Sequence, residues 1–124
     1  MQSLADELFD QAVNLGTKRP VVHFQVGLNV LNRQGSLYPD LHVDGVMGAE
    51  TLHALFALFK VDGALRSTQR LNKMMNSQQC CHYLERCLQD PSQEVFLRGW
   101  LERVVLPEKV IRVYGRTAAP LNRV

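Results

Sequence analysis

Residues 43–55 combine a glycine-containing turn with the start of a helix, and this stretch restricts the fold more than any other. Asp44-Gly45 is a strong turn signal because glycine accepts the positive φ of tight turns and aspartate bonds to nearby backbone. Gly48 allows a second bend before a helical pattern begins at Ala49. Apolar residues then recur at steps of three and four: Leu52, Leu55, Phe56 and Phe59. The stretch holds no recognisable catalytic group, which favours a binding module.

The rest of the chain also shows helical periodicity, with no convincing strand alternation before the last segment. The expected helices run from Ser3 to Asn14, from Pro20 to before Gly35, from Ala49 to Phe59, from Asp62 to Gln89 and from Asp90 onward. A break near Asn76-Ser77 is left open. The sequence therefore predicts an all-α fold, a compact bundle of about five helices with one long loop, residues 35–48, between helices two and three.

Helix boundaries are predicted from capping residues. Ser3 and Asp62 are candidate N-caps, and Gly16 is a stop signal. At the last helix, Asp90, Pro91 and Gln93 form a variant of the capping box, in which two side chains satisfy backbone amides. The residues predicted to face inward are Leu4, Leu8, Ala12, Leu15, Val21, Phe24, Leu28, Leu31, Leu65, Leu71, Met74, Met75, Cys81, Leu84, Leu88, Phe96, Trp100 and Val104.

Length and charge limit the classes of function. A chain of 124 residues with 46% hydrophobic content supports one core. We expect a helical domain over residues 1–106 and a basic tail over 107–124, where four basic side chains accompany one acidic side chain. A net charge of +2 is too small to indicate nucleic acid, and no apolar run is long enough for a membrane span. The tail is interpreted as a solvated terminus or as a docking strip for an anionic polymer or partner.

The three cysteines indicate a reduced compartment, because their number is odd and Cys80-Cys81 are adjacent. Cys80, Cys81, His82 and Cys87 lack the paired spacing of a zinc site. Cys80 and Cys87 are expected to pack as small hydrophobic residues. We therefore predict neither a metal nor a cofactor. The N-terminus shows no signal peptide pattern, so the chain is expected to be made in the cytoplasm.

Three motifs carry a resemblance to a known family. Phe24-Gln25, Leu28 to Leu31, Asp44-Gly45, Gly48 and Thr51 occur in the order of the small helical peptidoglycan-binding repeat. With Phe9–Gly16 and Phe96–Val104 on either side, the chain from about residue 4 to 105 resembles the C-terminal domain of phage-type N-acetylmuramidases, glycoside hydrolase family 108. The resemblance implies an endolysin-like module that binds bacterial cell wall, with the glycan or the stem peptide of peptidoglycan as its ligand.

The family's catalytic glutamate belongs to a Glu-Asn-x-Gly-Gly segment that this sequence lacks. We therefore expect a wall-binding module that positions a catalytic muramidase segment or partner and acts at the wall or in the periplasm. Two alternatives remain: a complete but divergent or two-chain muramidase, and a protein-interaction adaptor that uses the basic tail. Glu7 and Asp10 could share a helix face as glycosidase carboxyls, although first-turn acids are also favoured by the helix dipole.

The candidate binding residues come from the loop and from the flanking motifs. Tyr38 and His42 lie in the loop, where no periodicity requires burial, and they are the preferred contacts. Asp44 could bind an amine or a hydroxyl, or else bond to its own turn. From the resemblance, Asn14 and Arg103 are placed on a surface beside the catalytic half. Trp100 is interpreted as a core residue, with a sugar platform as the alternative.

Overall fold

The structure is a computed structural model, and it describes residues 3–104. Within that range all regular secondary structure is helical, which confirms the predicted all-α fold. The elements are α1 (Leu4–Leu15), α2 (Lys18–Val30), α3 (Ala49–Asp62), α4 (Ala64–Gln89), the 3₁₀ turn η1 (Pro91–Gln93) and α5 (Glu94–Leu101). The tail and its predicted boundary at residue 106 lie outside the described residues.

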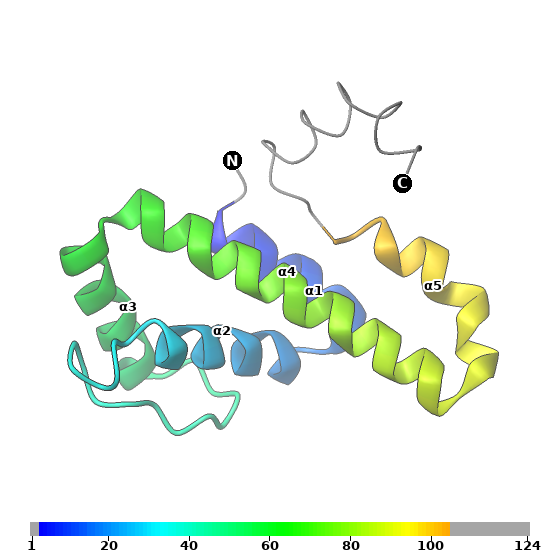
Figure 1. The fold of residues 1–124 in the computed structure, drawn as a ribbon, viewed down its shortest axis with the longest axis horizontal. Coiled ribbons are helices and arrows are strands. Elements are labelled where there is room, and N and C mark those ends of the chain that lie inside the picture. Colours follow the sequence, from blue (N-terminus) through cyan, green and yellow to red (C-terminus); the bar gives the residue numbers. More distant parts are fainter. Residues whose placement is uncertain (1–2, 105–124) are drawn as a thin grey trace, which may run out of the picture.

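Helix α4 is the central element of the fold. At 26 residues it is the longest helix, and it contacts α1, α2, α3, η1 and α5. Figure 1 shows α3 at the N-terminal end of α4, while α5 turns back beside the C-terminal half. The long loop leaves α2 and returns to α3 on the side of α2 away from α1 and α4 (Figure 1). This arrangement places the loop at one end of the molecule and α5 at the other.

The first helix starts and stops at the predicted residues. The Ser3 hydroxyl accepts a hydrogen bond from the Asp6 amide at 3.0 Å, which satisfies one of the unpaired amides of the first turn. Gly16 ends the helix with a φ of 83°, a conformation that glycine adopts without strain. The next helix begins at Lys18, so that Pro20 lies within its first turn as predicted. These boundaries follow from local sequence alone.

The predicted cap at Asp62 is wrong. Helix α3 continues through Asp62, and Gly63, with a φ of 86°, separates it from α4. The Asp62 carboxylate accepts hydrogen bonds from Arg33 at 3.0 Å and Arg70 at 3.3 Å. The Asp62 carboxylate, which the sequence assigns to a helix start, is therefore used in ion pairs with Arg33 and Arg70.

Helix α4 has no break near Asn76-Ser77. Both side chains bond to their own helix: Asn76 donates to the Asn72 carbonyl at 2.8 Å, and Ser77 donates to the Lys73 carbonyl at 2.9 Å. Polar side chains at these positions therefore coexist with an uninterrupted helix.

The start of the last helix confirms half of the predicted capping box. Asp90 accepts from the Ser92 amide at 3.1 Å and from its hydroxyl at 2.7 Å. The Gln93 side chain instead accepts from Arg86 at 3.3 Å. Because Arg86 lies on α4, this second bond joins two elements and does not close the cap.

The main core lies between α2, α3 and α4. Its fully buried side chains include Phe24, Leu28, Leu58, Leu71 and Met75. Gly27 allows the close approach of α2 to α4, because an added Cβ there would lie 3.1 Å from Leu71 Cδ2. The predicted inward positions Phe24, Leu28, Leu71 and Met75 are thus confirmed.

Other predicted inward positions are wrong. The helical pattern of α3 does not mark its buried face, because Leu52 and Phe56 are exposed whereas Ala54, Leu55 and Leu58 are buried. On α4 and α5 the exposed residues are Leu65, Cys81, Leu84, Leu88 and Phe96. Helix α4 buries Asn72, Asn76, Gln79 and Tyr83 at the corresponding turns, so part of its inward face is polar.

Trp100 packs at the contact between α4 and α5. Its ring is half-buried and stacks on Tyr83, with ring centroids 5.1 Å apart, and on the exposed Phe96 at 5.8 Å. The Arg86 guanidinium lies 5.0 Å from the Trp100 ring centroid, within the range of a cation–π contact. These contacts agree with the structural interpretation of Trp100, since α5 attaches to α4 through them.

Candidate functional site

The long loop is held to α2 by amide side chains. Asn32, fully buried just after the end of α2, donates to the Tyr38 carbonyl at 2.6 Å and to the Asp40 carboxylate at 2.8 Å. Its oxygen accepts from the backbone amides of Leu37 and Tyr38 at 3.1 and 3.0 Å. One side chain thus satisfies a whole turn of loop backbone that would otherwise lack partners.

Asn29 repeats this arrangement one helical turn earlier. Its nitrogen donates to the Leu41 carbonyl at 3.0 Å, and its oxygen accepts from the Leu41 amide at 2.8 Å. The side-chain amide therefore pairs with one loop residue through both backbone groups, as a neighbouring strand would.

Gln25 connects the three parts of the central motif. Its buried nitrogen lies 3.1 Å from the Asp44 carboxylate, 3.0 Å from the Val46 carbonyl and 3.0 Å from the Thr51 hydroxyl. Its oxygen accepts from the Gly45 amide at 3.0 Å. The hydrophobe-Gln pair, the Asp-Gly turn and the threonine therefore belong to one hydrogen-bond network that attaches the loop and the start of α3 to α2.

Gln25, Asn29 and Asn32 form what we call the amide stripe. They recur at steps of four and three, so they follow one side of α2 and its end. The sequence motif included Gln25, but the roles of Asn29 and Asn32 were missed. Their helical spacing beside a long loop was the signal that could have found them. The amide stripe makes the loop a rigid surface element.

Tyr38 is buried, although no periodicity in the loop sequence requires it. Its side chain is 8% exposed and packs in the main core, and its hydroxyl donates to the Leu28 carbonyl at 2.6 Å. Burial, together with the negative charges of Asp40 and Asp62, raises the pKa of Tyr38 to about 12. Tyr38 therefore anchors the loop through its ring and hydroxyl.

Asp44 bonds to its own turn. Its carboxylate accepts from the Val46 amide at 2.9 Å as well as from Gln25. The bond from the Val46 amide, followed by that from Gln25, lowers the pKa of Asp44. This geometry agrees with the turn-forming alternative for Asp44. His42, two residues earlier, is exposed on the loop surface.

The two candidates from the flanking motifs lie elsewhere. Arg103 is exposed just after α5, which contacts α4 and η1 and lies at the end of the molecule opposite the loop (Figure 1). Asn14 is in the last turn of α1, and its side chain lies outside the described part of the structure. The structure therefore brings Tyr38, His42 and Asp44 onto one loop and does not bring Arg103 to it.

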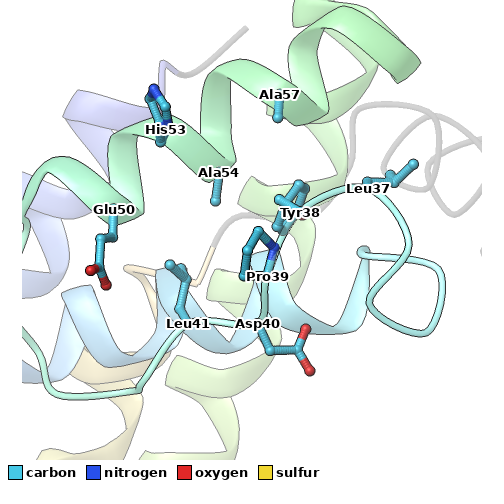
Figure 2. Close-up of a pocket in the computed structure, with 9 residues that line it drawn as sticks. All are labelled: Leu37, Tyr38, Pro39, Asp40, Leu41, Glu50, His53, Ala54 and Ala57. Carbon is cyan, nitrogen blue, oxygen red and sulfur yellow. The ribbon is translucent and has the colours of Figure 1, made fainter.

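A hollow of about 440 Å³ lies between the loop and α3. Figure 2 shows the loop running beside α3, with the small Ala54 and Ala57 on the side of α3 that faces the loop. We call it the loop groove, and its lining residues are Leu37, Tyr38, Pro39, Asp40, Leu41, Glu50, His53, Ala54 and Ala57. Its volume is within the range of roughly 300–1,000 Å³ that is usual for ligand sites.

Glu7, the first of the two suggested glycosidase carboxyls, is buried. It is 1% exposed and accepts from the Gln11 side chain at 2.7 Å. Gln11 also donates to the Met75 carbonyl at 3.0 Å, and its oxygen lies 2.9 Å from His23 Nδ1. Because Gln11 donates with its nitrogen, His23 must donate to its oxygen. Glu7 lies in the first turn of α1, where the helix dipole favours acids, but its side chain is buried in the fold.

Burial, reinforced by the positive charges of Arg19 and His82, lowers the pKa of His23 to about 4. The neutral imidazole, protonated on Nδ1, is therefore the form that joins α1 to α2 at neutral pH. This network ties α1, α2 and α4 together beneath the surface.

Over residues 3–104, no group of three or more His, Cys, Asp or Glu side chains is arranged to hold a metal ion. No helix in that range is long and apolar enough to cross a membrane. Cys80, Cys81 and Cys87 carry free thiols, and Cys87 is buried as predicted.

The described residues form a small all-helical domain with a rigid loop beside a ligand-sized groove, which is the architecture of a binding module. A family model described as "Predicted Peptidoglycan domain" matches residues 19–105, and the chain belongs to that family. The match includes the amide stripe, the loop groove and α5, and it begins after the Phe9–Gly16 motif. A comparison with curated proteins gives no match.

Proposed function

We propose that this domain binds peptidoglycan through the loop groove and positions a muramidase-type lytic activity on the bacterial wall. The observation that carries the proposal is a ligand-sized groove built on a rigid loop, in a chain of the predicted peptidoglycan domain family. Rigid loops bind with a smaller loss of conformational entropy than mobile ones. The association with a muramidase is supported by the flanking motifs Phe9–Gly16 and Phe96–Val104. The proposed place of action is the cell wall or the periplasm.

Burial of Glu7 favours binding over independent catalysis by the Glu7 and Asp10 pair. A glycosidase acid must reach the oxygen between two sugars, and a second carboxyl must flank the same bond. Glu7 is enclosed and bonded to Gln11, so it does not present its carboxyl to a polymer at the surface. A binding module should therefore attach to walls without degrading them.

Co-sedimentation with purified insoluble peptidoglycan tests the proposal. The wild-type protein should pellet with the polymer, and Ala57→Phe should pellet at least about tenfold less, because the larger ring fills the loop groove. Ala64→Phe is the matched control, since Ala64 is exposed at the start of α4 and does not line the groove. Circular dichroism should show equal helicity for all three proteins.

Two results would contradict the proposal. Pelleting no greater than that of an unrelated helical protein would reject wall binding, and equal pelleting of both variants would remove the loop groove from it. The turbidity of the same wall suspension tests the alternative of a complete muramidase. A fall in turbidity that Glu7→Gln or Asp10→Asn abolishes would establish catalysis by this chain.

A further inference from the structure

Two carboxylates and no lysine or arginine line the loop groove. Asp40 and Glu50 contribute the carboxylates, and His53 contributes an imidazole. Arg33, which follows α2 close to the loop in sequence, bonds to Asp62 on α3 instead. A ligand in the groove therefore meets hydrogen-bond acceptors and negative charge.

Apolar surface makes up the rest of the lining. Figure 2 shows Ala54 and Ala57 on α3 facing the loop side that carries Tyr38 and Pro39, with Leu41 near the Glu50 end. The Asp40 carboxylate is directed away from α3, so it lies at the outer edge of the groove (Figure 2). The groove thus combines a narrow apolar floor with carboxylates at its edges.

Peptidoglycan offers two chemically different ligands to such a groove. Its glycan strand is largely uncharged and carries many hydroxyl donors and acetamide methyl groups. Its stem peptides carry more carboxylates than amines, so their net charge is negative. Carboxylates on the protein accept strong hydrogen bonds from hydroxyls and repel other carboxylates. The two parts of the polymer therefore interact with Asp40 and Glu50 in opposite ways.

We propose that the loop groove binds the glycan strand of peptidoglycan, with an acetamide methyl against Ala54 and Ala57 and sugar hydroxyls donating to Asp40 and Glu50. This inference rests on the proposed wall-binding function and assigns the part of the polymer that is recognised. The amide stripe supports it, because Asn32 bonds to one carboxylate oxygen of Asp40 and fixes the position of that acceptor. The rigid acceptor favours a ligand that supplies donors.

Competition for wall binding separates the two ligands. Soluble N-acetylglucosamine oligomers supply an uncharged glycan with acetamide and hydroxyl groups, and amidase treatment of purified walls supplies the stem peptides. The oligomers should displace the protein from insoluble peptidoglycan, whereas the peptides at the same molar concentration should leave it bound. Displacement by peptides alone, or by neither competitor, would overturn the glycan assignment while leaving wall binding intact. Failure to pellet at all would reject the proposed function itself.

Glu50→Gln provides a second test, because the affinity for glycan and the affinity for an anionic peptide should change in opposite directions. Loss of the charged acceptor should weaken binding to glycan strands by about three- to tenfold. Binding of an anionic peptide would instead become stronger, since a repulsive charge is removed. Glu85→Gln is the control, because Glu85 is exposed on α4 and does not line the groove. Unchanged or tighter glycan binding by Glu50→Gln would overturn the inference.

Discussion

Gln25 illustrates how a single buried amide can specify a loop. It donates to partners on both the loop and α3, and it accepts from Gly45. Only an amide side chain supplies donor and acceptor together at this length. The motif that resembles a peptidoglycan-binding repeat is therefore an architectural motif, and the proposed contact residues lie beside it.

Gln25→Glu should destabilise the protein by about 2–4 kcal/mol at pH 7. The replacement keeps the acceptor for Gly45 but loses the donors to Val46 and Thr51, and it places a second carboxylate against Asp44. Urea unfolding measures the change in the free energy of unfolding. Gln69→Glu, an exposed position on α4, should change it by less than about 0.5 kcal/mol. Equal stability of the two variants would show that the network contributes little.

Tyr38 shows what residue-level sequence analysis misses. In the sequence it stands in a loop without periodicity, so nothing indicates burial. In the structure it fills the core between α2 and α3, because Asn32 turns the loop back over the helix that precedes it. Its role as a ligand contact stays a prediction, and only the part of its surface that lines the loop groove can carry that role.

At the level of elements, helix identity and most boundaries could be predicted. Ser3, Gly16 and Asp90 are local signals that the structure confirms. Asp62 is not such a signal, because its ion-pair partners, Arg33 and Arg70, are 29 residues before it and 8 residues after it in the chain. The inward face of α4 was also mispredicted, because buried asparagine and glutamine side chains carry no hydrophobic signal. Polar burial is a tertiary property, and periodicity of apolar residues cannot detect it.

Asn29→Ala should loosen the loop without unfolding the bundle. It removes both bonds to Leu41, which together contribute about 1–2 kcal/mol to local order. Hydrogen exchange of the Leu41 amide should accelerate about tenfold or more, while core amides such as that of Leu71 keep their protection. Val30→Ala, at the exposed neighbouring position, should leave both rates unchanged. Unchanged exchange at Leu41 in Asn29→Ala would contradict a rigid loop.

At the level of the whole molecule, the buried His23 makes stability depend on pH. Its pKa falls from 6.5 to about 4 on folding, so between these values the unfolded chain binds a proton that the folded chain does not. Stability from this group is therefore constant above pH 6.5 and decreases as the pH falls toward 4. The full loss should be about 3 kcal/mol.

Urea unfolding at pH 7.0, 5.5 and 4.5 measures this decrease. His23→Gln can still donate to Gln11 but does not titrate, so it should flatten the dependence. His42→Gln is the control, because His42 is exposed, and it should keep the wild-type slope. An equally steep slope in His23→Gln would assign the acid sensitivity to other groups.

The all-α fold could be predicted from the whole sequence, but the loop groove could not. Its walls come from two segments that the sequence describes as a loop and a helix, and their separation depends on how Asn29 and Asn32 hold the loop. The small size of Ala54 and Ala57 has meaning only once that loop is placed opposite them. The sequence therefore does not reveal how far the loop lies from α3 in the fold.

The amide stripe also has an evolutionary consequence. Its side chains donate hydrogen bonds to the backbone carbonyls of Tyr38, Leu41 and Val46. The exposed side chains of Pro39, His42 and Val43 take no part in these bonds. Relatives could therefore exchange those outward residues and acquire new targets while folding equally well. In this respect the loop is comparable to a variable loop on a fixed framework.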